Sequence, residues 1–159
     1  MTGAPTLGHV AIVTQDPAAM AAFYRDLLGM EVTLQGALPQ LGDFAFLSGQ
    51  PETEFAELAF VTNPRARHIA LRVESLATLK AVYAEVKKRK IPLPAPALNH
   101  QVSLSLYLQD PDGNMVEIYW ATGEKAGDPM AEPVDLERPD AELLALVQRR
   151  EPVPQGERS

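Results

Sequence analysis

Apolar and polar residues alternate along two short stretches that flank a turn-forming cluster, Asp110 to Asn114. Leucines occupy every second position of residues 103–109, and Val116 and Ile118 keep the same spacing after the turn. Since successive side chains of a strand point to opposite faces, this pattern predicts a hairpin of two strands. The second face of the hairpin carries Tyr107 and Glu117. A carboxylate that is shielded there needs a partner for its charge, and a metal ion is one such partner.

The pattern along the chain occurs twice. The first unit consists of a strand at 7–14, a helix that begins at Asp16-Pro17 and ends at Gly29, and strands at 31–35, 44–48 and 54–62. The second unit consists of a strand at 68–73, a helix from 75 to about 90, a linker at 92–99 that is rich in proline and alanine, and the hairpin. This internal repeat predicts two similar modules that share one cleft.

Two residue types recur at matching offsets in this repeat. His68 follows His9 by 59 residues, and Glu117 follows Glu57 by 60 residues.

We expect one domain over residues 1–122, with modules at about 7–62 and 68–120. We expect residues 123–159 to form an extension with a short helix at about 139–150 and a loose tail.

Composition narrows the possible partners. The 159 residues carry a formal net charge of −7 and a pI near 4.9, which argues against nucleic acid and against an anionic membrane surface. A small-molecule substrate is the expected partner. The absence of cysteine excludes disulfides, thiolate metal sites and cysteine nucleophiles. No apolar run approaches the length of a membrane span and no signal peptide is apparent, so we expect a cytoplasmic protein.

Strand parity places eight polar residues on the face opposite the helix-packing side chains. They are His9, Glu57, His68, Arg72, Ser103, Ser105, Tyr107 and Glu117. A single histidine on a strand is more often structural, but two histidines in equivalent positions favour a shared metal site. Two imidazoles with one or two carboxylates suit a divalent ion of the iron, manganese, nickel or zinc type. Arg72 could anchor an anionic group of a substrate, or it could be a surface arginine.

The order of the elements, the positions of His9, His68 and Glu117, and the run Asp110-Pro111-Asp112-Gly113-Asn114 before Val116-Glu117-Ile118-Tyr119 resemble the vicinal oxygen chelate superfamily. The resemblance covers about Leu7 to Trp120. Glyoxalase I, type I extradiol dioxygenases, methylmalonyl-CoA epimerase and the fosfomycin and bleomycin resistance proteins belong to this superfamily. It implies an α+β fold in which paired βαβββ modules form a curled mixed sheet around a metal cleft.

The run from Asn99 to Tyr107 resembles the extradiol ring-cleaving dioxygenases. That resemblance implies that His9, His68 and Glu117 bind Fe(2+) and that the substrates are a catechol-type molecule and dioxygen. By the same resemblance, His100 is a general acid or base and Tyr107 donates a hydrogen bond to the catecholate.

Two alternatives stay open because the chain reads Ala56-Glu57 where those dioxygenases commonly have a further pocket histidine. If Glu57 joins the other three ligands, the site resembles that of glyoxalase I or an epimerase, a lyase or isomerase centre that uses Mn(2+), Ni(2+), Co(2+) or Zn(2+). A resistance protein that only binds a drug is the third class. The extra helix and the exposed sheet edges of such a fold predict a homodimer.

Overall fold

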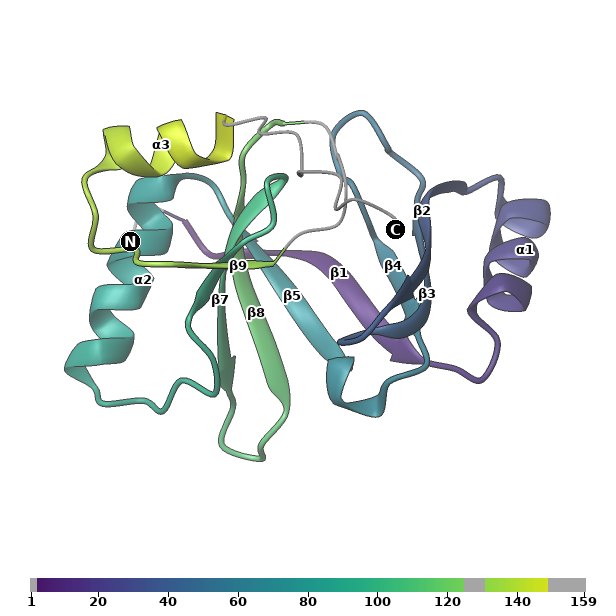
Figure 1. Cartoon of the computed structure of the whole chain (residues 1–159), viewed down its shortest axis with the longest axis horizontal. Coiled ribbons are helices and arrows are strands. Elements are labelled where there is room, and N and C mark those ends of the chain that lie inside the picture. The colour runs from purple at the N-terminus through teal and green to yellow at the C-terminus, as the bar shows by residue number, and fades with distance from the viewer. Residues whose placement is uncertain (1–2, 125–130, 149–159) are drawn as a thin grey trace, which may run out of the picture.

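The computed structural model describes residues 3–124 and 131–148, and it contains a single nine-stranded mixed sheet with helices on its outer side (Figure 1). Helix α1 lies at one end of the molecule, and α2 and α3 lie together at the other end (Figure 1). The strands between them run in the order β2-β3-β4-β1-β5-β8-β7-β6-β9. The sheet is not closed, because β2 and β9 form its two edges.

The elements follow the two predicted units. The first module contains β1 (Thr6–Val13), α1 (Pro17–Leu28), β2 (Glu31–Leu38), β3 (Gly42–Ser48) and β4 (Leu58–Val61). After the 3-10 helix η1 (Pro64–Ala66), the second module contains β5 (His68–Val73), α2 (Leu76–Lys88), β6 (Ala97–Asn99), β7 (Ser103–Gln109) and β8 (Met115–Ala121). Strand β9 (Glu132–Val134) and helix α3 (Asp140–Gln148) follow.

Local signals determine where the first two helices begin and end. Asp16 accepts a hydrogen bond from the backbone N–H of Ala19 at 2.9 Å, and Ser75 caps α2 through the N–H of Thr78 at 3.1 Å. Gly29 ends α1 in the left-handed region with φ of 70°. The caps predicted at Asp16 and Gly29 are confirmed.

The two modules meet through their first strands. Strands β1 and β5 are antiparallel neighbours at the centre of the sheet, while β1 is parallel to β4 and β5 is parallel to β8. His9 pairs with Ala70 and Ala11 pairs with His68, so an approximate twofold axis relates His9 to His68. The predicted α+β fold, with paired modules in a mixed sheet, is confirmed.

The predicted equivalence of the two glutamates is wrong. In the first module Ala11 pairs with Ala59, and in the second module Ala70 pairs with Glu117, so Ala59 occupies the position related to Glu117. Glu57 precedes β4 and lies two residues earlier in this register. The 60-residue spacing between Glu57 and Glu117 does not reveal this two-residue difference in register. The segments that lead into β4 and β8 differ in length and pairing.

Three further boundaries differ from the prediction. Residues 97–99, at the end of the expected linker, form β6. The extension after residue 122 contains β9, which pairs with β6 at the sheet edge. The strand expected over 54–62 is shorter, since only Leu58–Val61 pairs with neighbours. The predicted tail at 151–159 and the last residues of the predicted helix lie outside the described residues.

The helices bury the outer sides of the sheet in two separate cores. One core contains Leu79, Leu104 and Leu106 of the second module together with Leu136 and Leu143 of the extension. The other contains Ala21, Ala45, Leu47 and Phe60 of the first module. The leucine face of the predicted hairpin therefore packs against α2 and α3, which leaves the opposite face of β7 and β8 for the polar residues.

Candidate metal centre and pocket

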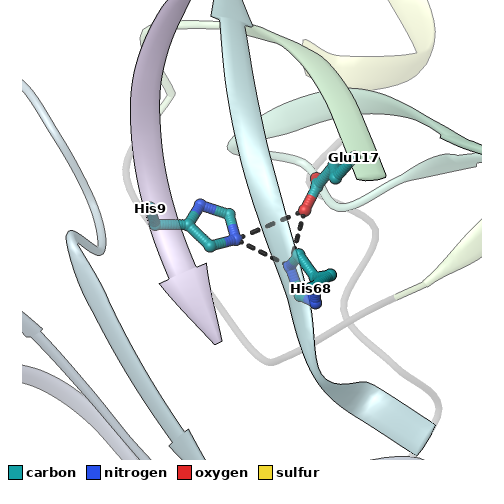
Figure 2. Close-up of side chains that lie close together, drawn as sticks. All are labelled: His9, His68 and Glu117. Atoms are coloured by element: carbon teal, nitrogen blue, oxygen red, sulfur yellow. Dashed lines mark hydrogen bonds and ion pairs between the residues drawn. The ribbon is translucent and has the colours of Figure 1, made fainter. Parts of the chain in front are cut away.

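Three neighbouring strands bring two histidines and a glutamate together on the inner face of the sheet. His9 from β1, His68 from β5 and Glu117 from β8 point toward one another (Figure 2). The Nε2 atoms of the two histidines are 2.9 Å apart, and Oε2 of Glu117 lies 3.3 Å from Nε2 of His9 and 3.0 Å from Nε2 of His68. One ligand atom from each residue therefore lies within 4.8 Å of the other two.

Burial and mutual charge shift the pKa values of Glu117 and His68 in this cluster. The Glu117 side chain is 4% exposed. Burial acts to raise its pKa, but hydrogen bonds and charge interactions with the two histidines prevail and hold the pKa well below its usual value. For His68, burial acts to lower the pKa, whereas the hydrogen bond and charge of Glu117 raise it above the ordinary value. The cluster without metal therefore favours an imidazolium–carboxylate pair.

The donor set fits a divalent metal ion. Two imidazole nitrogens and one carboxylate oxygen form the facial set that holds iron(II) in non-haem oxygenases, with further positions open to ligands. The backbone carbonyl of Ala66 lies 2.8 Å from Nδ1 of His68, so Nε2 is the ring nitrogen that faces the cluster. Such outer contacts orient a metal ligand before the metal binds.

Tyr107 lies beside the cluster and contacts His100. Tyr107 is the cross-strand partner of Glu117, and its ring centroid is 6.0 Å from that of His68. Its hydroxyl oxygen is 3.0 Å from Nε2 of His100. Burial, together with the charge of Glu117, raises the pKa of Tyr107 well above its usual value, so the phenol keeps its proton.

The structure does not bring Glu57 to the other three residues. Its Oε2 accepts hydrogen bonds from the N–H of Gly49 at 2.6 Å and the hydroxyl of Ser48 at 3.3 Å, and its Oε1 accepts one from Gln50 at 3.4 Å. The carboxylate is thus engaged in the turn after β3. Ser103 and Ser105 are buried and hydrogen-bond to each other at 3.0 Å.

A pocket of about 930 Å³ opens in front of the cluster. His9, His68, His100, Tyr107 and Glu117 all line it. The first module contributes apolar side chains to the lining, among them Leu34, Leu38, Phe46, Phe55, Ala59 and Val61. The pocket therefore combines the polar cluster, to which both modules contribute, with apolar side chains of the first module, a combination typical of small-molecule sites.

Sequence reasoning missed two residues of this pocket and left the role of a third open. Glu54 and Tyr119 line it, and their side chains are joined by a hydrogen bond of 3.0 Å. Arg72 also lines the pocket, where it forms an ion pair with Glu54. Tyr119 shares the strand parity of Glu117, so its place on the inner face could have been found. Glu54 could not, because its segment has no regular pattern.

No helix in residues 3–124 or 131–148 is long and apolar enough to cross a membrane.

Comparisons with known proteins agree with this geometry. A family model for the Glyoxalase/Bleomycin resistance protein/Dioxygenase superfamily matches residues 6–118. Biphenyl-2,3-diol 1,2-dioxygenase 3 from Rhodococcus globerulus is 32% identical over 139 residues, which cover 82% of this chain and 72% of that protein.

Two solved structures are also similar in fold. A catechol 2,3-dioxygenase matches with a TM-score of 0.58 and 25% identity over 82% of this chain. The present chain covers 49% of that dioxygenase, about half its length. A methylmalonyl-CoA epimerase in complex with methylmalonyl-CoA matches with a TM-score of 0.58 and 18% identity over 79% of this chain and 100% of the epimerase. On the evidence of its sequence match and its paired modules, the chain belongs to the Glyoxalase/Bleomycin resistance protein/Dioxygenase superfamily.

Proposed function

We propose that the protein is an iron(II)-dependent extradiol dioxygenase that opens the ring of a catechol-type molecule. The observation that carries this proposal is the buried cluster of His9, His68 and Glu117, with Tyr107 and His100 beside it in one pocket. The similarity to biphenyl-2,3-diol and catechol dioxygenases supports the same chemistry. A bound iron(II) ion would supply the positions at which a catechol and dioxygen come together.

The chain's own residues then bind and orient the substrate. Tyr107, which keeps its proton, donates a hydrogen bond to a catecholate oxygen beside the cluster. His100, in hydrogen-bond contact with that phenol, accepts or returns the substrate proton. The apolar wall of the first module binds the ring or its substituent and keeps water away from it.

The lyase or epimerase alternative depends on Glu57 as a fourth ligand. Both oxygens of that carboxylate accept hydrogen bonds within the turn after β3. Ala59 stands at the position related to Glu117 by the approximate twofold axis, and it offers no ligand atom. These two observations favour the three-ligand dioxygenase over the four-ligand enzyme.

Anaerobic reconstitution with iron(II) tests the proposal. After exposure to air with catechol or biphenyl-2,3-diol, we expect oxygen uptake that matches formation of a yellow ring-fission product. Tyr107→Phe should keep the iron and slow turnover by about 100-fold, as expected for loss of a group that assists proton transfer. Glu117→Gln should lose the iron, and Glu57→Gln should retain it.

The opposite pattern would support the alternative enzyme. If the native protein takes up no oxygen but holds nickel, zinc or cobalt, and Glu57→Gln releases that metal, the dioxygenase proposal is wrong. We further propose that the protein is a homodimer and is cytoplasmic, as expected from the sequence.

A further inference from the structure

The segment that joins β3 to β4 is tied to the second module by one carboxylate. Glu54 lies in this segment, residues 50–56, and its Oε2 accepts a hydrogen bond from Nη1 of Arg72 at 3.0 Å. Its Oε1 accepts a hydrogen bond from the hydroxyl of Tyr119, also at 3.0 Å. Nη1 of Arg72 lies 3.3 Å from the carbonyl oxygen of Thr53 as well. The segment, which belongs to the first module, is thus hydrogen-bonded to residues of β5 and β8 in the second module.

The backbone of β1 leaves room for this contact at one position. The ring of Tyr119 passes over Gly8, and a Cβ atom at residue 8 would collide with the Tyr119 hydroxyl. Gly8 lies where the pairing of β1 with β5 shifts register, between Leu7 and His9. Burial first, and then the charge of Glu54, raise the pKa of Tyr119 far above its ordinary value, so the phenol remains a donor.

The same segment is anchored at its base by the glutamate predicted to bind metal. Glu57 accepts hydrogen bonds from Gly49 and Ser48, as described above. At the start of the segment, the N–H groups of Thr53 and Glu54 both donate to the carbonyl oxygen of Gln50 at 2.9 Å. Glu57 therefore holds the segment to its own module, and Glu54 holds its tip to the other one.

The segment forms a wall of the pocket close to the cluster. Residues 51–56 line the pocket together with Arg72 and Tyr119. The ring centroid of Tyr119 is 5.7 Å from that of His9, and the ring of Phe55 packs against Phe46 with centroids 6.0 Å apart. The Glu54 side chain is 15% exposed and that of Arg72 is 39% exposed, so solvent screens this ion pair only in part.

We propose that Glu54 is a positioning residue that fastens segment 50–56 to β5 and β8 and thereby shapes the pocket wall where substrate binds. Because Arg72 is paired with Glu54 and segment 50–56 itself contains no basic residue, this wall offers no unpaired cation, which suits an uncharged ring or substituent rather than an anionic one. The substrate part of this inference rests on the proposed dioxygenase function. The structural part, that Glu54 orders the segment, does not.

Amide hydrogen exchange on the native protein and its variants tests the structural part. In Glu54→Ala, we expect the backbone amides of residues 53 and 54 to exchange at least about tenfold faster. The variant loses a hydrogen-bonded charge, so the segment opens more often. Tyr119→Phe should give a smaller increase in the same peptide, and Glu54→Gln, which keeps an acceptor for Tyr119, should lie between native and Glu54→Ala. Glu52→Gln, an exposed carboxylate two residues earlier, is the matched control. Bound metal per chain should stay at the native level in all four variants.

Steady-state kinetics with biphenyl-2,3-diol test the role of Glu54 in substrate binding. For Glu54→Ala we expect the KM for biphenyl-2,3-diol to rise about tenfold while kcat changes less than about threefold, since the residue shapes the wall and does not touch the cluster. Arg72→Gln should remove the cationic partner of Glu54 and should also raise the KM. Native exchange rates in both Glu54→Ala and Tyr119→Phe would overturn the proposal. Faster exchange with an unchanged KM would overturn the role in substrate binding. If the native protein cleaves no catechol, the exchange results still decide whether Glu54 orders the segment, so the two failures are distinct.

Discussion

At the scale of single residues, the cluster is the feature with the clearest chemical consequence. The pKa of His68 is raised, so its proton stabilises the metal-free fold at pH values below the ordinary value near 6.5, and this contribution is lost as pH rises through the raised pKa. A metal ion must displace that proton to reach Nε2. We therefore expect metal binding near neutral pH to release protons. Calorimetric titration of the metal-free protein with zinc, in buffers of different ionisation heat, measures the number released.

The matched variants separate ligands from neighbours. Removal of a ligand in Glu117→Gln should cost more than the roughly 10–100-fold in affinity that is typical of outer contacts. Tyr107→Phe should leave both the affinity and the proton release near native values. A heat of binding that is independent of the buffer would contradict the imidazolium–carboxylate pair.

At the scale of elements, helix α3 completes the core of the second module although it lies beyond the repeat. Leu143 is fully buried in the core that also contains residues of α2 and of the sheet, whereas the adjacent Leu144 is 39% exposed. Lys80 and Lys87 of α2 also form ion pairs with Asp140 and Glu137. We expect Leu143→Ala to lower the free energy of unfolding by about 2–5 kcal/mol and Leu144→Ala by less than about 1 kcal/mol. Urea denaturation of the two variants measures both changes, and equal values would show that α3 does not contribute to the core.

At the scale of the whole molecule, the outer face of the central strands carries apolar side chains that the helices leave uncovered. Leu7 and Ile12 of β1 and Ile69 of β5 are 67%, 36% and 44% exposed. An exposed apolar stripe of this kind is typical of an interaction surface. We therefore expect the predicted homodimer to use this face, and sedimentation velocity should show a dimer that Ile69→Glu converts to monomer. Leu27→Glu, on the exposed side of α1, is the control. A native protein that is monomeric at all concentrations measured would remove the homodimer.

Periodicity in the sequence by itself determined the two modules, the hairpin and the three-residue cluster. His68 and Glu117 lie in stretches where apolar and polar residues alternate, and alternation fixes the face of a side chain without knowledge of its neighbours. His9 lies beside the register shift of β1, and its equivalence to His68 in the repeat placed it. The caps at Asp16 and Gly29 were predictable for a related reason, since they depend on contacts within four residues.

Only the tertiary structure decided what happens where the pattern is irregular. Strands β6 and β9 have three residues each, too few for a periodic signal, and they form because β6 pairs with both β7 and β9. Glu57 lies apart from His9, His68 and Glu117 because register, which depends on pairing between strands, places Ala59 opposite Ala11 at the position related to Glu117. The bond between Glu54 and Tyr119 joins residues 65 positions apart. No local propensity encodes such a contact, because it forms only when the two modules close around one pocket.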